Sequence, residues 1–143
     1  MRKLDYDVVK ESLTNSSEDS AIYIGCDSKL TGPYTVFGLV VIIHIESSKG
    51  GMCFAKKFRE DRRMEIQERL LKEVDYAISC ASELQDFVGE RTFEVHLDLN
   101  GDKKHKSNKL LTTAVGWVES RGFKFKIKPN AFAASTAADY ILQ

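Results

Sequence analysis

The chain has 143 residues, of which 43% are hydrophobic and 29% charged, with two prolines and nine glycines. This length fits one domain, expected to span residues 1–143 with an N-terminal helix and loop over 1–20. The composition excludes collagen-like, disordered and disulfide-framework proteins. Lysines and arginines number 21, and aspartates and glutamates also number 21. A net charge of zero excludes a positive field over the whole molecule, so any binding of nucleic acid must be local.

The cysteines and the apolar runs indicate a cytoplasmic protein. Cys26, Cys53 and Cys80 are far apart and show no C-x-x-C spacing, so neither a disulfide framework nor a zinc site is predicted. The longest apolar run, residues 37–43, is too short to span a bilayer, and the N-terminus has no apolar signal segment. We therefore expect no membrane partner, and a monomer or homodimer.

The first elements predicted after the N-terminal helix and a polar loop are three strands. Alternation predicts a strand over 21–28, and the segment 34–46 is too apolar for an exposed edge. The segment 34–46 should therefore be covered on both faces for part of its length. A third, more polar strand covers 52–59. Tight turns separate the three strands, so we expect an antiparallel meander.

The period then changes from two to 3.6, which predicts a long amphipathic helix over 62–88. Strict alternation marks strands over 92–100 and 123–129, with a helix over 107–120 between them and a short helix over 131–143 after them. Trp117 lies on or beside the apolar stripe of the helix over 107–120, so we expect it to pack in the core.

This order, β-β-β-α-β-α-β-α, predicts the α/β fold class: a mixed five-stranded sheet with helices on its faces. Strands that follow crossover helices should lie parallel to the first strand. In such a sheet, ligands are expected at the carboxyl ends of the parallel strands.

Four carboxylates fall where that edge should form. Asp27 lies near the end of the first strand and Asp98 near the end of the fourth, so the two should repel each other or recruit a cation. Glu73 lies on the buried edge of the long helix, and Asp139 lies on the last helix. An all-oxygen cluster is the ligand chemistry of Mg²⁺ or Mn²⁺ rather than zinc.

The residues alone leave other interpretations open. Asp27 and Asp98 could cap turns, and Asp139 could be an exposed acid on a frayed end. Glu73 could pack its stem at the boundary while its carboxylate pairs with a neighbouring lysine or arginine. A calcium loop starting at Asp98 is excluded, because lysines stand at positions 103 and 109, where the loop needs glycine and glutamate.

Positive charge concentrates between residues 103 and 128, where eight lysines and arginines face a single acid, Glu119. These residues are Lys103, Lys104, Lys106, Lys109, Arg121, Lys124, Lys126 and Lys128. A lysine loop before one helix and a lysine-lined strand after it could follow a phosphate backbone. The alternative is an ordinary solvated face.

Four runs are distributed over about residues 22–139, which is most of the chain: IGCDSK, RLLKEVDYAIS, HLDLN and GFKFKIKPNAFAASTAAD. Together with the order of elements, they resemble the ribonuclease H-like superfamily, and within it the YkuK-type ribonuclease H-like family of bacteria and phages. That family more often has a threonine and a glutamine where this chain has Cys26 and Lys29. The C-terminal run is the most specific of the four.

The resemblance implies a divalent-metal-dependent nuclease that hydrolyses phosphodiester bonds in an RNA/DNA hybrid or in structured DNA. It implies two Mg²⁺ or Mn²⁺ ions held by a tetrad of carboxylates. Glu68 remains an alternative to Glu73 as the tetrad member on the long helix. The tetrad consists of Asp27, Glu73, Asp98 and Asp139, bordered by Ser28, His96, Lys128 and Ser135. His96 or Lys128 could assist proton transfer or contact the scissile phosphate. The alternative is a binding module, for nucleic acid or protein, that keeps the fold without turnover.

Overall fold

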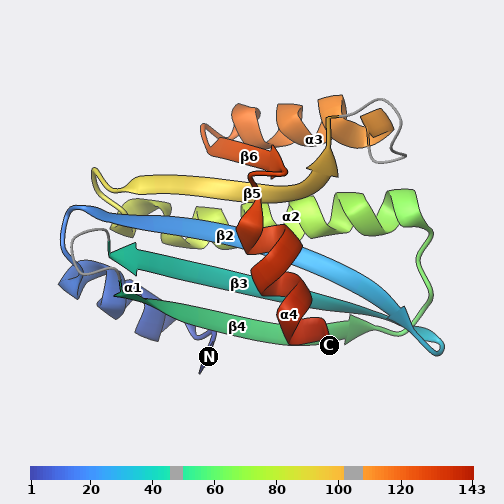
Figure 1. The fold of residues 1–143 in the computed structure, drawn as a ribbon, viewed down its shortest axis with the longest axis horizontal. Coiled ribbons are helices and arrows are strands. Elements are labelled where there is room, and N and C mark those ends of the chain that lie inside the picture. The colour runs from blue at the N-terminus through green and yellow to red at the C-terminus, as the bar shows by residue number, and fades with distance from the viewer. Residues whose placement is uncertain (46–49, 102–107) are drawn as a thin grey trace.

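The computed structural model describes residues 1–45, 50–101 and 108–143 (Figure 1). In chain order, the elements are β1 (Arg2–Lys3), α1 (Tyr6–Asn15), β2 (Ser20–Thr31), β3 (Tyr34–Ile45), β4 (Gly50–Glu60), α2 (Ile66–Leu84), the 3-10 helix η1 (Gln85–Phe87), β5 (Thr92–Asn100), α3 (Asn108–Ser120), β6 (Lys124–Lys128), the π-helix η2 (Ala133–Ala138) and α4 (Asp139–Leu142).

The described strands form one mixed sheet in the order β1-β4-β3-β2-β5-β6. The antiparallel meander β2-β3-β4 and the parallel strands β5 and β6 confirm the predicted α/β class. The prediction of five strands is wrong by one, because β1 adds a sixth strand parallel to β4 at the sheet edge. Two residues cannot show an alternating pattern, and β1 is fixed instead by tertiary contacts such as the Leu4 N–H donating to the Ala55 carbonyl at 2.9 Å.

Helices cover both faces of the sheet, and Figure 1 shows α1 and α2 behind it and η2 with α4 in front. We call the face under α1, α2 and α3 the back face, and the face under residues 131–143, the C-terminal segment, the front face. The main core fills the back, where β2, β3 and β5 bury Ile24, Leu39 and Leu97. A smaller cluster on the front joins Val40 to Ala133 and Ala138. Strand β3 is thus covered on both faces, as its apolar run predicted.

The long helix begins later than its periodicity indicated, at residue 66 rather than 62. The buried Thr35 hydroxyl donates to the Arg62 carbonyl at 2.8 Å and accepts the Met64 N–H at 2.9 Å. These bonds hold the approach to α2 against β3 in a non-helical conformation. At the other end, α2 passes into the 3-10 turn η1 before Gly89, whose φ of 58° is in the left-handed region that suits glycine.

Trp117 does not pack in the core, contrary to the prediction, and is 40% exposed. The buried stripe of α3 runs through Ala114 and Val118, and Trp117 lies one residue beside it. Because neighbouring positions on a helix are about 100° apart, this offset turns the indole outward. Among the described residues, no helix is both long and apolar enough to cross a membrane.

Candidate metal centre

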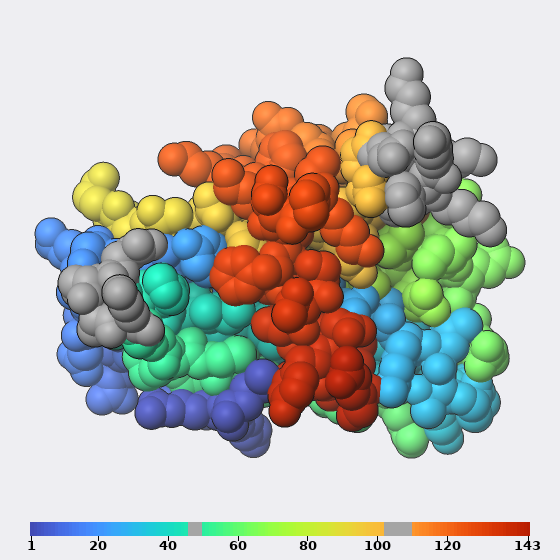
Figure 2. Space-filling model, viewed as in Figure 1, coloured from blue at the N-terminus to red at the C-terminus, as the bar shows by residue number. Residues whose placement is uncertain are grey.

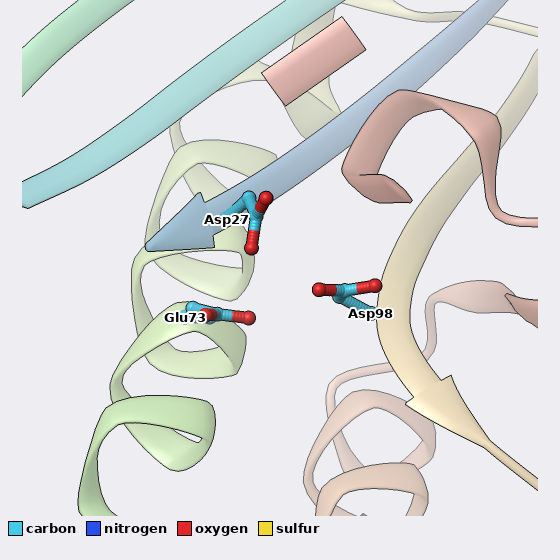
Figure 3. Close-up of side chains that lie close together, drawn as sticks. All are labelled: Asp27, Glu73 and Asp98. Carbon is cyan, nitrogen blue, oxygen red and sulfur yellow. The ribbon is translucent and has the colours of Figure 1, made fainter. Parts of the chain in front are cut away.

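The site lies where two parallel strands separate. Residue pairing between β2 and β5 runs from Ala21 and Thr92 to Gly25 and His96 and then stops. Two residues further along each strand stand Asp27 and Asp98, and Figure 3 shows their carboxylates facing each other across the gap. The parallel pairing predicted from the order of elements is what makes these two acids neighbours.

Helix α2 contributes the third carboxylate. Glu73 points from α2 into the same space (Figure 3), and one carboxylate oxygen from each of Asp27, Glu73 and Asp98 lies within 4.8 Å of the other two. The three acids therefore meet at one point although they come from three separate elements, β2, α2 and β5.

Glu73 is the helix-borne acid of the cluster, and Glu68 is not. The Glu73 side chain is 4% exposed, and its Oε2 accepts a hydrogen bond from the Ser28 hydroxyl. Glu68 instead pairs through both oxygens with Arg62 at the surface. The sequence also allowed the Glu73 carboxylate to pair with a neighbouring lysine. Lys72 does not form that pair, because its ammonium group lies 3.7 Å from Glu60 instead.

The cluster has the donor set that a hard cation requires. All of its donors are carboxylate oxygens, which suit Mg²⁺ or Mn²⁺. Glu73 Oε1 is buried and has no hydrogen-bond partner among the described residues. A buried carboxylate oxygen left without a partner is costly unless a cation or a proton satisfies it. The residues present therefore fit a bound divalent ion.

Without an ion, the cluster retains protons. Burial, followed by the charge of Asp98, raises the pKa of Asp27 to about 7. Burial also raises the pKa of Glu73 well above its usual range, and the charges of Asp27 and Asp98 add to this effect. Like charges held together in a desolvated space favour the protonated acids. A cation that replaces those protons would remove the repulsion.

Lys128 supplies the one positive group that contacts the cluster among the described residues. Its Nζ lies 2.8 Å from Asp98 Oδ1, and its side chain is 39% exposed. Burial alone would lower the pKa of Lys128, but the hydrogen bond to Asp98 and the negative charges around it raise the pKa overall. Lys128 therefore stays charged at neutral pH.

Asp139, the fourth acid of the predicted tetrad, lies beside the cluster at the start of α4. The Asp139 carboxyl group lies near enough to Asp27 to contribute to the raised pKa of Asp27. Asp139 itself is exposed, and its Oδ2 accepts a hydrogen bond from Gln143 Nε2 at 3.3 Å. It lies outside the group of three that converge within 4.8 Å.

His96 does not present a free ring nitrogen to the carboxylates. Its side chain is 2% exposed, its Nδ1 accepts the Ala133 N–H at 3.2 Å, and its Nε2 lies 3.3 Å from Glu94 Oε1. Burial lowers the pKa of His96 despite the contact with Glu94, so the ring is neutral. Other groups contact both ring nitrogens, so neither nitrogen is placed to exchange a proton with the carboxylates.

The predicted nucleic-acid-binding residues have different positions. Lys124 and Lys126 are exposed and lie opposite Glu94 and His96 in the sheet, which places them on the front face. Ser28 belongs to the cluster through its bond to Glu73, and the Ser135 hydroxyl donates at 3.0 Å to the carbonyl of Ala131, which lies just before the helix that holds Ser135. The remaining predictions concern residues that are not described: Lys103, Lys104, Lys106 and the side chain of Lys109.

The structure adds cations that the sequence analysis missed. Asp27 pairs with Gly38 on β3, and Gly38 pairs with Lys57 on β4, so Lys57 and Asp27 share the front face. Lys29 lies two residues beyond Asp27 on that face, and the Arg59 guanidinium lies 4.0 Å from the centroid of the Tyr34 ring. Only the register of the meander could reveal this second basic group, because its members are far apart in sequence.

The fold and the site together define a class of protein: a mixed α/β sheet with a carboxylate cluster where two parallel strands diverge. The ribonuclease H-like family model matches residues 6–143. The chain belongs to the ribonuclease H-like family.

Proteins that resemble the chain include a bacterial relative and a solved domain. The uncharacterized protein YkuK of Bacillus subtilis (strain 168) is 30% identical over 132 residues, which covers 81% of this chain and 75% of that protein. The YkuK-type resemblance seen in the sequence is thus confirmed. Among solved structures, the N-terminal RNase H domain of rv2228c from Mycobacterium tuberculosis, determined as a fusion with maltose binding protein, gives a TM-score of 0.42 at 13% identity. That match covers 84% of this chain and 91% of the other.

Proposed function

We propose that this chain is a divalent-metal-dependent nuclease that hydrolyses phosphodiester bonds in an RNA/DNA hybrid or in structured DNA. The observation that carries the proposal is the convergence of Asp27, Glu73 and Asp98 within 4.8 Å, with a buried oxygen of Glu73 left without a partner. A nuclease needs such a cluster to hold cations against a phosphate that is itself negative.

In this mechanism Asp27 and Asp98 would hold Mg²⁺ or Mn²⁺, and Glu73 and Asp139 would complete the sites. Two bound ions would activate water and stabilise the leaving oxygen. Ser28 orients Glu73 by donating to one of its oxygens, which leaves the other free to bind. Lys128 stays charged, so it acts as a cation toward phosphate rather than as a base.

The front face provides local positive charge for a polyanion although the chain is neutral as a whole. Lys124 and Lys126 lie on the β6 side of the cluster, and Lys29 and Lys57 lie on the other side. Cations on both sides of the carboxylates would hold a phosphate backbone across them. The three free cysteines agree with a reducing, cytoplasmic location for this reaction.

A second candidate is a binding module that keeps the fold without turnover, and the Lys128 contact favours it. The ammonium group already neutralises Asp98 at 2.8 Å. A cluster that carries its own cation needs less from a metal, so it could bind a partner without cleaving it.

The experiment that separates these candidates incubates the purified chain with labelled hybrid, duplex, single-stranded and branched nucleic acids. Each reaction runs with Mn²⁺ and, in parallel, with chelator. Cleavage that requires Mn²⁺ supports the nuclease, and the substrate cleaved identifies its class. Binding of any of these nucleic acids without cleavage supports a module that binds nucleic acid. A chain that neither binds nor cleaves them contradicts the nuclease and that module, and leaves a module that binds protein.

Binding should weaken steeply with salt, because phosphate contacts release counterions. The slope of log K against log[salt] is negative, and its magnitude should decrease by about one unit for each cation removed. We therefore expect Lys57→Ala and Lys126→Ala each to reduce the slope, as measured by fluorescence anisotropy on an uncleavable substrate. The matched control is Lys10→Ala, which removes the same charge from α1, where Lys10 contacts Glu83 at 3.3 Å behind the sheet. A slope that neither front-face variant changes would contradict a phosphate path over this face.

A further inference from the structure

The C-terminal segment is the element that brings Asp139 to the carboxylates, and it lies very close to the front face. Figure 2 shows it running across the middle of this face. A Cβ at Gly25 would lie 2.3 Å from the Ala133 carbonyl carbon, and one at Gly38 would lie 2.8 Å from the Ile141 side chain. Gly25 on β2 therefore permits a backbone approach that any side chain would block, and Gly38 on β3 leaves space for the Ile141 side chain.

One polar contact fixes the segment laterally. The Ala133 N–H, at the first residue of η2, donates to His96 Nδ1 at 3.2 Å. Backbone N–H groups in the first turn of a helix have no partner within the helix, so this bond satisfies a group that burial would otherwise leave unpaired. The His96 ring also packs against Phe132, with centroids 5.1 Å apart, and against Tyr23 at 5.0 Å.

The contacts determine which ring nitrogen carries the hydrogen. Because Nδ1 accepts an N–H, it must be unprotonated, and the hydrogen of the neutral ring lies on Nε2, where it can donate to Glu94 Oε1. Each ring nitrogen thus has a separate task. Nδ1 holds the C-terminal segment, and Nε2 holds the ring against β5 through Glu94.

We propose that His96 is a positioning residue, whose Nδ1 sets the start of η2 and thereby places Asp139 against Asp27. The inference deepens the proposed function and rests on it, since it takes the carboxylate cluster as a metal site. From Ala133 the chain runs through the π-helix η2 directly into α4, which begins at Asp139. Fixing the position of Ala133 therefore also fixes Asp139, because one continuous helix joins the two residues. The usual role of a buried strand histidine, packing alone, predicts no such link to Asp139.

The test compares two replacements that each keep one side of the ring. In His96→Asn the amide oxygen can take the place of Nδ1 and keep the bond to Ala133. In His96→Gln the amide reaches the position of Nε2, keeps the contact with Glu94 and leaves the Ala133 N–H without an acceptor. The readout is Mn²⁺ affinity, measured by electron paramagnetic resonance of the free ion, so that it does not depend on cleavage.

We expect the Asn variant to bind Mn²⁺ within about threefold of the wild type and the Gln variant to bind about tenfold more weakly, as for other residues that orient ligands. Asp139→Asn should cause a similar loss. The double variant His96→Gln with Asp139→Asn should bind Mn²⁺ no more weakly than Asp139→Asn alone, because both changes remove the same contribution to metal binding. Additive losses, or a Gln variant that binds like the wild type, would overturn the positioning role.

A metal-free measurement keeps the proposal testable if the Gln variant does not fold. Nitrogen-15 chemical shifts of the wild-type ring should show Nδ1 unprotonated and Nε2 protonated, and the Ala133 amide should exchange slowly with solvent. A protonated Nδ1 or a rapidly exchanging Ala133 amide contradicts the proposal. Wild-type protein that fails to bind Mn²⁺ would instead refute the metal site itself, so failure of this inference and failure of the proposed function can be told apart.

Discussion

Replacing Asp27 or Asp98 by asparagine is expected to reduce metal-dependent cleavage about a thousandfold or more. Charge stabilisation by a bound metal contributes several kcal/mol to a transition state, and each 1.36 kcal/mol corresponds to about tenfold in rate. The metal-free Asp27→Asn variant should be as stable as the wild type or more stable, because the change removes one of the mutually repelling charges. Asp98→Asn also removes a repelling charge but loses the ion pair with Lys128, so its stability should stay close to that of the wild type. Asparagine at position 27 can still accept the Ser28 N–H that Asp27 Oδ1 accepts at 2.8 Å.

Single-turnover cleavage and denaturant unfolding in chelator measure the two effects separately. The matched control is Asp75→Asn, which removes the same charge from an exposed position of α2 two residues after Glu73. It should change neither cleavage nor stability by much. Marked destabilisation of both the Asp27 and the Asp98 variants would instead favour the turn-capping role that the sequence left open for them.

Metal should stabilise the chain, and the stabilisation should increase as the pH rises through about 7. The pKa of Asp27 is about 7 in the folded chain against 3.8 in the unfolded one. The folded state therefore holds more protons, and the stability of the metal-free protein is lost as pH rises toward and through 7. A metal ion needs the ionised carboxylates, so it binds better at the higher pH and restores the lost stability.

Thermal melting at pH 6.5 and 8.5, with Mn²⁺ and with chelator, measures this prediction. At a hundredfold its Kd, an ion that binds only the folded state contributes about 2.7 kcal/mol, or a rise in Tm of roughly 5–11 °C for a chain of this size. His96 has a lowered pKa, so it affects stability only below about pH 6.5. In Asp27→Asn the part of the pH dependence that Asp27 causes should disappear, and the part that the buried Glu73 causes should remain. A Tm that millimolar Mn²⁺ leaves unchanged at pH 8.5 would count against the metal site.

The order of elements was readable from the sequence because each element has its own period. Alternation identified β2, β5 and β6, the apolar composition of 34–46 identified β3, tight turns marked off β4, and the 3.6-residue stripe identified α2, with errors of a few residues at the ends. The misplaced start of α2 shows the limit of this method, since the buried Thr35 hydroxyl holds residues 62–64 against β3. No local pattern contains that contact.

The carboxylates, too, could be predicted only in part from the sequence. Asp27 and Asp98 could be proposed as neighbours because parallel strands bring corresponding ends together. The choice of Glu73 over Glu68 needed the packed helix, in which Ser28 contacts one acid and Arg62 the other. His96 looked like a candidate for proton transfer in sequence, yet tertiary contacts occupy both of its ring nitrogens.

The sequence by itself determined the fold class, the resemblance to the family and the two strand aspartates as candidates, because these depend on local periods and on residue types along the chain. The tertiary structure decided the sixth strand, the exposed position of Trp117, the basic residues Lys29 and Lys57 beside the cluster, and the role of His96. Each of these depends on register or on packing between segments far apart in sequence. The raised pKa of Asp27 has the same origin, because burial and the approach of Asp98 exist only once β2 and β5 are paired.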